Sequence, residues 1–376
     1  MKRTELVTIA ALVSACSTLG TPASAPGPLP HGGTGQFRAL TTNETTLPAS
    51  PAGLTVSTGG LAIEDAMSIE GNLFYAAARF HIVPPSDAGA MDAGMPMDAS
   101  VDAATPVDTN VDAGPIAAPS VDWSHYDARQ IYRSTSGASW GFAEGATALS
   151  ASAAWEGGYV TDPWVLRRAD GRYLLYYSAD GGIGVASAAT LDGPWMREGS
   201  APIVATSAAG RPRRPSAIST AGLEGATAAI VVYYELGGAL HLASSGDGVG
   251  LHDLGTIPTM PIAARDDRDG VETSVGAPGA IVVPTPAGRR VVRFYYESRR
   301  SNGTVLIAML GSANGIAFDQ FPLPVFAERD RQAPAPRYVD PRTTLLYTWI
   351  PNAGSGAVIA SVSPAAVGLA HVAPMP

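Results

Sequence analysis

The chain has 376 residues, of which 42 are glycine, 31 are proline and only 15% are charged. Its formal charge of −9 is opposite to the basic surface that nucleic-acid binding needs, so we exclude nucleic acid as a partner. The single cysteine excludes a disulfide within the chain, and the six histidines lack the spacing of a zinc site. We therefore expect neither a metal nor a cofactor. The high content of glycine and proline predicts a fold of many short strands joined by turns.

The N-terminus has the form of an export signal. Lys2 and Arg3 precede an apolar stretch over 6–13 that is too short to span a bilayer in the mature protein. The segment ends in Val13-Ser14-Ala15-Cys16, which resembles the lipobox of bacterial lipoproteins. We predict a signal peptide over 1–16, lipidation of Cys16, and a membrane-anchored lipoprotein of a bacterial cell envelope, at the outer membrane or cell surface. The alternative is an ordinary secretory signal with an incidental cysteine.

Three segments have a composition that does not favour a packed core. Residues 17–57 are rich in small and polar residues and are predicted to form a flexible tether. Residues 84–120 contain six aspartates and no basic residue, but not the ligand spacing of a calcium loop. We expect a disordered insertion that emerges from a surface hairpin, without which the net charge changes from −9 to −3. Residues 365–376 are expected to form a C-terminal tail.

A unit recurs four times after residue 160 as a proline-containing strand, an aromatic strand and a small-residue strand. The prolines are Pro163, Pro215, Pro278 and Pro336, and each is followed by an aromatic segment such as Leu174-Leu175-Tyr176-Tyr177-Ser178. Repeats of about 40–50 residues or slightly more are typical of four-stranded propeller blades. Sequence on both sides of the acidic insertion supplies one more unit. The sequence thus predicts an all-β, single five-bladed β-propeller over 58–364, with blades at 58–155, 156–207, 208–264, 270–328 and 330–364.

The second blade carries a family resemblance. Thr161-Asp162-Pro163-Trp164-Val165, with the aromatic strand and Leu191-Asp192-Gly193-Pro194-Trp195 after it, resembles a blade of the five-bladed propeller glycoside hydrolases of families 43 and 32. The resemblance implies a saccharide at the axial mouth and three carboxylates there, one from each of the first three blades. By this resemblance Asp65 matches the family's base or nucleophile, and Asp162 matches the aspartate that orients the site. Cleavage of a glycosidic bond also needs a protonated carboxyl group as the acid.

The third carboxylate position departs from that pattern. The third blade begins Arg211-Pro212-Arg213-Arg214-Pro215, and arginine has no usable proton at neutral pH. The nearest substitutes for the acid are Glu235, Glu272 and Glu297, of which Glu235 and Glu297 end second strands and are expected to approach the mouth. Arg213 and Arg214 either bind a carboxylated or sulfated sugar or divide between an ion pair and solvent.

Aromatic residues divide into two groups. The pairs Tyr176-Tyr177, Tyr233-Tyr234 and Tyr295-Tyr296 are expected to pack in the core between blades. Trp164, next to Pro163 and Asp162, is a candidate platform for a sugar ring, as are Trp123, Trp140 and Trp155.

Two functions follow from these patterns, and the sequence leaves both open. The first is a carbohydrate-active hydrolase that uses Asp65 and Asp162 with an unassigned acid. The second is a propeller without the acid that binds a glycan or a protein partner at its mouth. A propeller lineage unrelated to sugars is a third option. We expect a carbohydrate partner, a membrane contact through the N-terminal lipid, and a monomer.

Overall fold

The structure is a computed structural model that describes residues 38–39, 61–70, 72–83, 120–126, 129–135, 145–262, 270–285, 288–320, 325, 332–340, 343–350 and 357–362. For some strand residues of the first and last blades, including Asp65 and Trp349, it describes the backbone alone. The signal peptide with Cys16, the tether apart from 38–39, the insertion up to residue 119 and the C-terminal tail lie outside these residues.

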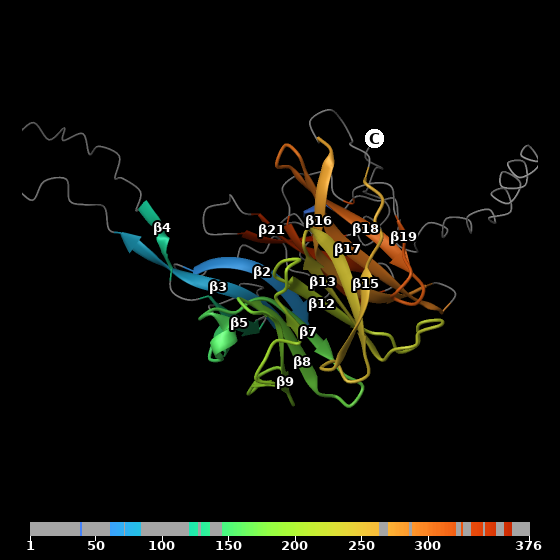
Figure 1. Cartoon of the computed structure of the whole chain (residues 1–376), viewed down its shortest axis with the longest axis horizontal. Helices are drawn as coiled ribbons and strands as arrows, with labels where there is room; N and C mark the ends of the chain where they lie inside the picture. Colours follow the sequence, from blue (N-terminus) through green and yellow to red (C-terminus); the bar gives the residue numbers. More distant parts are fainter. Residues whose placement is uncertain are drawn as a thin grey trace, which may run out of the picture.

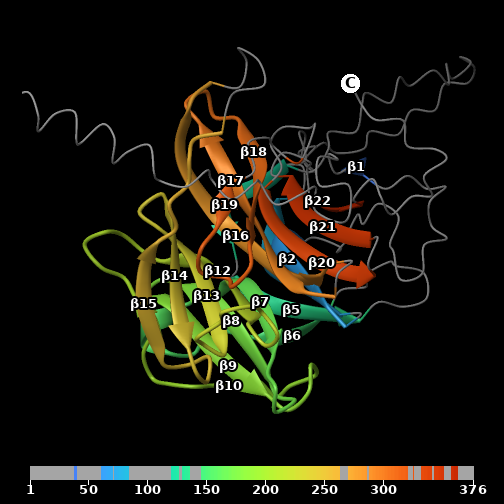
Figure 2. The same cartoon turned by 90° about the vertical axis from the view of Figure 1, so that its right-hand side faces the viewer.

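Five antiparallel sheets make up the described fold, and they follow one another around a common centre in sequence order (Figure 2). This arrangement confirms the predicted all-β propeller. The strands of the first two sheets are β2 (Leu61–Ile69), β3 (Asn72–Val83), β5 (Gln130–Thr135) and β6 (Ala146–Leu149), with β4 (Ser120–Tyr126) on β3, and then β7 (Thr161–Arg167), β8 (Tyr173–Ala179), β9 (Gly182–Ala188) and β10 (Met196–Arg197), with β11 (Val204–Ala205) on β9.

The remaining three sheets have four strands each. Figure 1 shows the sheets within the whole chain, coloured in sequence order. The remaining three comprise β12 (Arg213–Ser219), β13 (Ile230–Leu236), β14 (Ala239–Ser245) and β15 (Leu251–Thr256); β16 (Glu272–Pro284), β17 (Arg290–Arg300), β18 (Val305–Ser312) and β19 (Asp319–Gln320); and β20 (Gln332–Asp340), β21 (Thr343–Ile350), β22 (Ala357–Val362) and β1 (Arg38–Ala39). The acidic insertion falls between β3 and β4, which pair with each other. Among the described residues, no helix is long and apolar enough to cross a membrane.

The innermost strands close into a ring. The first strand of each sheet (β2, β7, β12, β16 and β20) contacts the first strand of the next sheet, and β20 contacts β2. The last sheet is completed from the N-terminus, because β1 pairs antiparallel with β22, with Arg38 opposite Val362. Residues 38–39 fall within the segment that was predicted to be a flexible tether, and these two residues pair with the last sheet. The unpaired backbone N–H and C=O groups of an edge strand can bond to the backbone of another segment, whatever side chains that segment carries.

Tyrosine side chains link neighbouring blades, as the sequence predicted. The hydroxyl of Tyr176 donates to the carbonyl of Gly248 at 2.9 Å, and that of Tyr233 donates to the carbonyl of Gly315 at 2.7 Å. Each bond runs from the second strand of one blade to a turn of the next. All six residues of the three tyrosine pairs are at most 3% exposed. The rings of Tyr176 and Tyr233 thus contribute apolar area to the core while their hydroxyl groups remain hydrogen-bonded.

Candidate functional site

The innermost strands share a bulge at the end where they begin. Register shifts interrupt the first strand pair of every blade, and in β2 the shift lies at Asp65. In the other four blades a residue with positive φ immediately precedes a proline, namely Asp162 (51°), Arg214 (53°), Ala277 (46°) and Ala333 (49°). A non-glycine residue in this region is strained and persists only where its surroundings hold it.

Acceptors from the preceding blade hold these bulges. The amide of Arg214 donates to the hydroxyl of Ser178 at 2.8 Å. The amide of Ala277 donates to Glu235 at 3.1 Å, and the amide of Ala333 donates to Glu297 at 2.8 Å. Each acceptor lies near the end of the second strand of the blade before it. The serine or glutamate that follows each tyrosine pair therefore joins one blade to the strained turn of the next.

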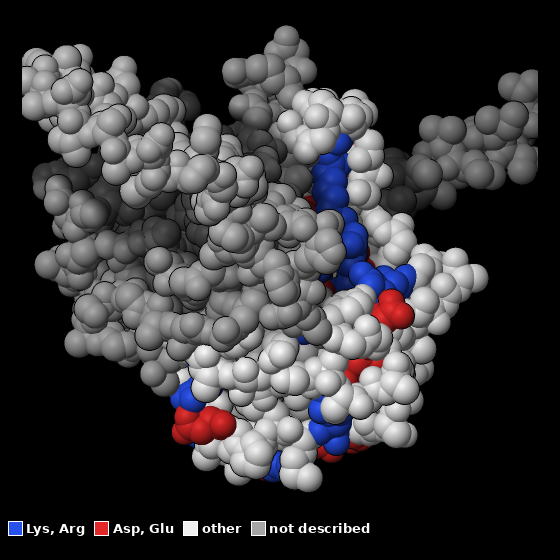
Figure 3. Space-filling view, turned by 90° about the vertical axis from the view of Figure 1, so that its left-hand side faces the viewer, with Lys and Arg blue, Asp and Glu red and all other residues white. Residues whose placement is uncertain are grey.

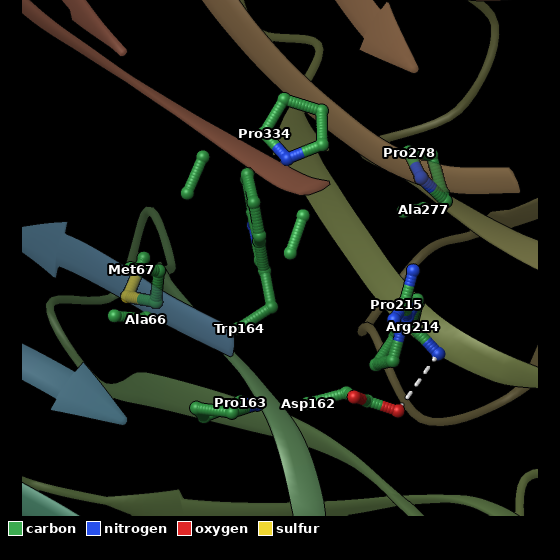
Figure 4. A pocket seen from close by; sticks show the side chains of 12 residues that line it. Ala66, Met67, Asp162, Pro163, Trp164, Arg214, Pro215, Ala277, Pro278 and Pro334 are labelled. Atoms are coloured by element: carbon green, nitrogen blue, oxygen red, sulfur yellow. Dashed lines mark hydrogen bonds between the residues drawn. The ribbon is translucent and has the colours of Figure 1, made fainter. Parts of the chain in front are cut away.

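These bulges surround a small cavity on the propeller axis, the axial pocket (Figure 4). Prolines 163, 215, 278 and 334 form much of its wall, and Asp162 and Arg214 are its two charged lining residues. Its volume of about 30 Å³ holds one or two water molecules, roughly. A saccharide would therefore have to lie across the mouth, because a sugar ring does not fit inside the pocket as described.

Asp162 lies at the mouth, as the resemblance implied, and is 8% exposed. One of its carboxylate oxygens accepts the amide of Arg214 at 3.3 Å, and the other accepts the hydroxyl of Thr161 at 3.4 Å. The dashed line in Figure 4 marks the first of these bonds. Asp65 lies in the neighbouring strand β2, at its bulge rather than at its start; its side chain is outside the described part of the chain.

Glu235 is buried and bound by two arginines. Its side chain accepts from Arg299 at 2.6 and 2.8 Å through both carboxylate oxygens, and from Arg213 at 2.6 and 3.1 Å. Burial alone raises the pKa of Glu235, but the hydrogen bonds and charge of Arg299, with Arg214 and Arg213 adding to them, lower it to about 2. A group with this pKa is ionised at neutral pH and has no proton to donate. Glu235 in this arrangement therefore does not fit the role of the general acid, for which it was a candidate in the sequence analysis.

Glu297 belongs to the same network and is 1% exposed. It accepts from Arg214 at 2.8 Å and from Arg299 at 2.8 and 2.9 Å. Arg299 therefore bridges Glu235 and Glu297, while Arg213 and Arg214 bind one glutamate each. Arg213 and Arg214, which the sequence analysis considered as ligands of an anionic sugar, thus both form ion pairs with glutamates. An ion pair was the alternative prediction for these arginines.

The surface reflects this arrangement of charges. On the face in Figure 3, basic side chains form a strip at the upper right, and acidic side chains lie in separate patches, one at the lower end of the strip and others lower on the face. Glu235 and Glu297 contribute almost nothing to any face, since they are 2% and 1% exposed, whereas the Arg213 side chain is 41% exposed. The carboxylates of Glu235 and Glu297 are thus inaccessible to solvent, while part of the Arg213 side chain remains accessible.

Glu272 and the tryptophans lie apart from that ion-pair network. Glu272 begins β16 and accepts the hydroxyl of Ser298 at 2.5 Å. Trp155 stacks on Tyr177 with ring centroids 5.9 Å apart, which is a core contact. The side chain of Trp123 and all of Trp140 lie outside what the structure describes.

Trp164 is buried and hydrogen-bonded to the neighbouring blade. It is 7% exposed, and its indole nitrogen donates to the carbonyl of Ala217 at 2.9 Å. Figure 4 shows its ring standing between Met67 and Pro334 at the bottom of the axial pocket. A ring packed in this way offers little of its face to a sugar, so the geometry favours a core role over the expected platform.

Sequence reasoning missed Arg299, the residue that ties the network together. A signal was present, because Glu297 and Arg299 are two positions apart in one strand and therefore lie on the same face of the sheet. The second partner, Glu235, lies in another blade, and no local pattern identifies it. No group of three or more histidine, cysteine or acidic side chains within the described ranges is arranged to hold a metal ion.

Comparison with known proteins gives likenesses in fold. No family model matches the chain, and no curated protein matches its sequence. Among solved structures, it is similar to an endo-arabinase from Bacteroides thetaiotaomicron, with 12% identity over 83% of this chain and 96% of that one and a TM-score of 0.49. A thermostable family-43 glycoside hydrolase has 13% identity over 82% and 91% of the two chains and a TM-score of 0.49. A family 117 glycoside hydrolase from Zobellia galactanivorans has 16% identity over 87% and 89% and a TM-score of 0.48.

Proposed function

We propose that this protein is a saccharide-binding propeller that holds a glycan across its axial mouth without hydrolysing it. One observation carries the proposal: the third-blade position that would supply the acid is Arg214, and the two buried glutamates beside it are bound by arginine. Hydrolysis requires one carboxyl group that stays protonated beside one that is ionised. Although burial raises the pKa of Glu235, Arg299, Arg214 and Arg213 together lower it to about 2, so this carboxyl group is ionised at neutral pH.

A hydrolase is the second candidate, and one feature favours it. Asp162 lies buried at the mouth, and Asp65 lies at the bulge of the adjacent innermost strand β2. Two aspartates on neighbouring strands are the arrangement that the sequence resemblance implies for the base and the orienting residue. Such an enzyme would need an acid other than Glu235, whose pKa is lowered to about 2.

Binding and product release together separate the two candidates. The full-length mature protein is run in native gels that contain arabinan or xylan, and reducing ends are assayed after prolonged incubation with each polysaccharide. We expect retardation by at least one polysaccharide and no new reducing ends. Asp162→Asn should reduce the retardation, because the variant removes the one anionic side chain of the axial pocket.

Asp170→Asn is the matched control for this test. Asp170 lies in the turn between β7 and β8 of the same blade and bonds the amide of Arg172, away from the axial pocket. Release of reducing ends that Asp162→Asn abolishes would establish the hydrolase instead. Absence of both retardation and release with a broad panel of polysaccharides would refute a carbohydrate function.

We further propose that Cys16 is lipidated and anchors the exported protein to a bacterial membrane, as the N-terminal pattern predicts. In cells supplied with radiolabelled palmitate, we expect label on the native protein and none on Cys16→Ser. The variant should also move from the membrane fraction to the soluble fraction, because two or more acyl chains are needed for stable anchoring. Equal membrane association of both proteins would contradict lipid anchoring.

A further inference from the structure

A second cavity lies on the propeller axis, at the end opposite the bulges. We call it the distal cavity; it is lined by the later residues of the five innermost strands, from Met67 in β2 to Tyr338 in β20. Its volume is about 450 Å³, compared with about 30 Å³ for the axial pocket. Trp164 lines both cavities, and its bond to the Ala217 carbonyl fixes the indole between them.

The size and walls of the distal cavity suit a small apolar molecule. Small-molecule sites in proteins commonly measure about 300–1,000 Å³, a range that includes the distal cavity and excludes the axial pocket. Aliphatic side chains from four of the strands line it, among them Ile69, Val165, Ile218 and Val282, and Trp164 is also part of its lining. Transfer of an apolar ligand from water to such walls is favourable in proportion to the area buried.

The charged residues that line the distal cavity favour a ligand with a negative charge. Arg290 lines it and donates to the Ala221 carbonyl at 2.7 Å, and among the described residues no carboxylate forms an ion pair with it. Arg337 also lines it. The one lining carboxylate, Glu70, accepts the hydroxyl of Tyr173 at 2.7 Å and pairs with Arg167 at 3.3 Å. Glu70 is thus paired with Arg167, and Arg290 remains as a cation at which an anionic group can bind.

From the apolar walls and this charge we infer that the distal cavity binds a small apolar molecule bearing one carboxylate, such as a medium-chain alkanoate. The alkyl chain lies along the aliphatic walls toward Trp164, and the carboxylate pairs with Arg290 at the opening. The site is separate from the saccharide site of the proposed function, since Trp164 divides the two cavities. Either assignment can fail while the other stands.

The test is a calorimetric titration of the full-length mature protein with octanoate and, separately, with octylammonium. The two probes share a chain length and differ in the sign of their charge. We expect saturable binding of octanoate and at least about tenfold weaker binding of octylammonium, because the latter places like charges together. Val282→Trp should weaken octanoate binding about tenfold or more by filling the cavity. Native-like thermal unfolding of the variant shows that it remains folded.

If Val282→Trp fails to fold, two variants that each remove one positive charge test the same inference. Arg290→Gln should weaken octanoate binding several-fold and narrow the difference between the two probes. Arg289→Gln is the matched control: it removes the same charge one residue away, where the side chain is 74% exposed and pairs with Glu224 outside the cavity. Binding of octanoate should change less than about twofold in this control. Absence of saturable binding, equal affinity for both probes, or equal losses in the two arginine variants would overturn the assignment.

Discussion

Replacement of Arg299 by methionine is expected to lower the free energy of unfolding by about 3–5 kcal/mol. Arg299 is the common partner of Glu235 and Glu297, which are 2% and 1% exposed, so its loss leaves two buried carboxylates short of their main cation. Breaking a buried ion pair from one side costs far more than the pair contributes, because the remaining charge stays desolvated. Urea denaturation of native and variant proteins measures the difference.

The control for this prediction is Arg289→Gln, whose ion pair with Glu224 joins side chains that are 74% and 73% exposed. An exposed pair of this kind contributes about 1 kcal/mol or less. The double variant Arg299→Met, Glu235→Gln should recover part of the loss, because it removes one of the two uncompensated charges. A loss from Arg299→Met no larger than that of the control would show that the network does not hold the blades together.

The same variant should alter the acid dependence of stability. The pKa of Glu235 in the folded protein is about 2, below its ordinary value of 4.5, so its contribution is present above pH 4.5 and is lost as the pH falls toward 2. Arg299 is the largest source of that depression after the opposing effect of burial. The difference in unfolding free energy between native and Arg299→Met should therefore narrow over this pH range.

Replacement of Gly279 by alanine is expected to destabilise the protein by about 3 kcal/mol. A Cβ atom on Gly279 would lie 1.8 Å from the carbonyl oxygen of Pro334, and backbone cannot move aside as a side chain can. Gly279 lies in β16 directly after the strained Ala277-Pro278 bulge, and Pro334 occupies the corresponding place in β20. The added methyl group should push the fourth and fifth blades apart at the mouth. Thermal and urea denaturation report the loss.

Gly311→Ala is the matched control, since Gly311 lies in β18 of the same blade and no heavy atom lies within 4 Å of the Cβ it would acquire. Its effect should stay within about 0.5 kcal/mol. Equal stability of the Gly279 and Gly311 variants would mean that the contact between the innermost strands β16 and β20 is loose.

The strained backbone turns and the buried glutamates lie together at the mouth for one physical reason. Four innermost strands turn through a left-handed residue before a proline, and the amides of Arg214, Ala277 and Ala333 each need an acceptor from the blade before. A buried acceptor as strong as a glutamate requires cations in turn. The arginines at the third blade are therefore explained by the structure without any ligand.

Local pattern was enough to predict the blades and the packing of the tyrosine pairs. Tyr176 and Tyr233 follow the two-residue alternation of a strand, and alternation is a property of the sequence itself. The placement of Asp162 at the mouth was predictable for a related reason, because the first strand of each blade begins at the same end of the axis.

Other features depended on residues that are distant in sequence. The pairing of β1 with the last blade joins Arg38 to Val362, and no periodicity in either segment indicates it. The same holds for Arg299, whose partner Glu235 lies in another blade. The all-β propeller and the absence of a carboxylate from the start of the third blade could be predicted from residue patterns alone, because both are properties of short stretches of sequence. The ion pairs of Glu235 and Glu297 became visible only in the folded chain, because the closed ring brings Arg213, Arg214 and Arg299 to them from strands β12 and β17.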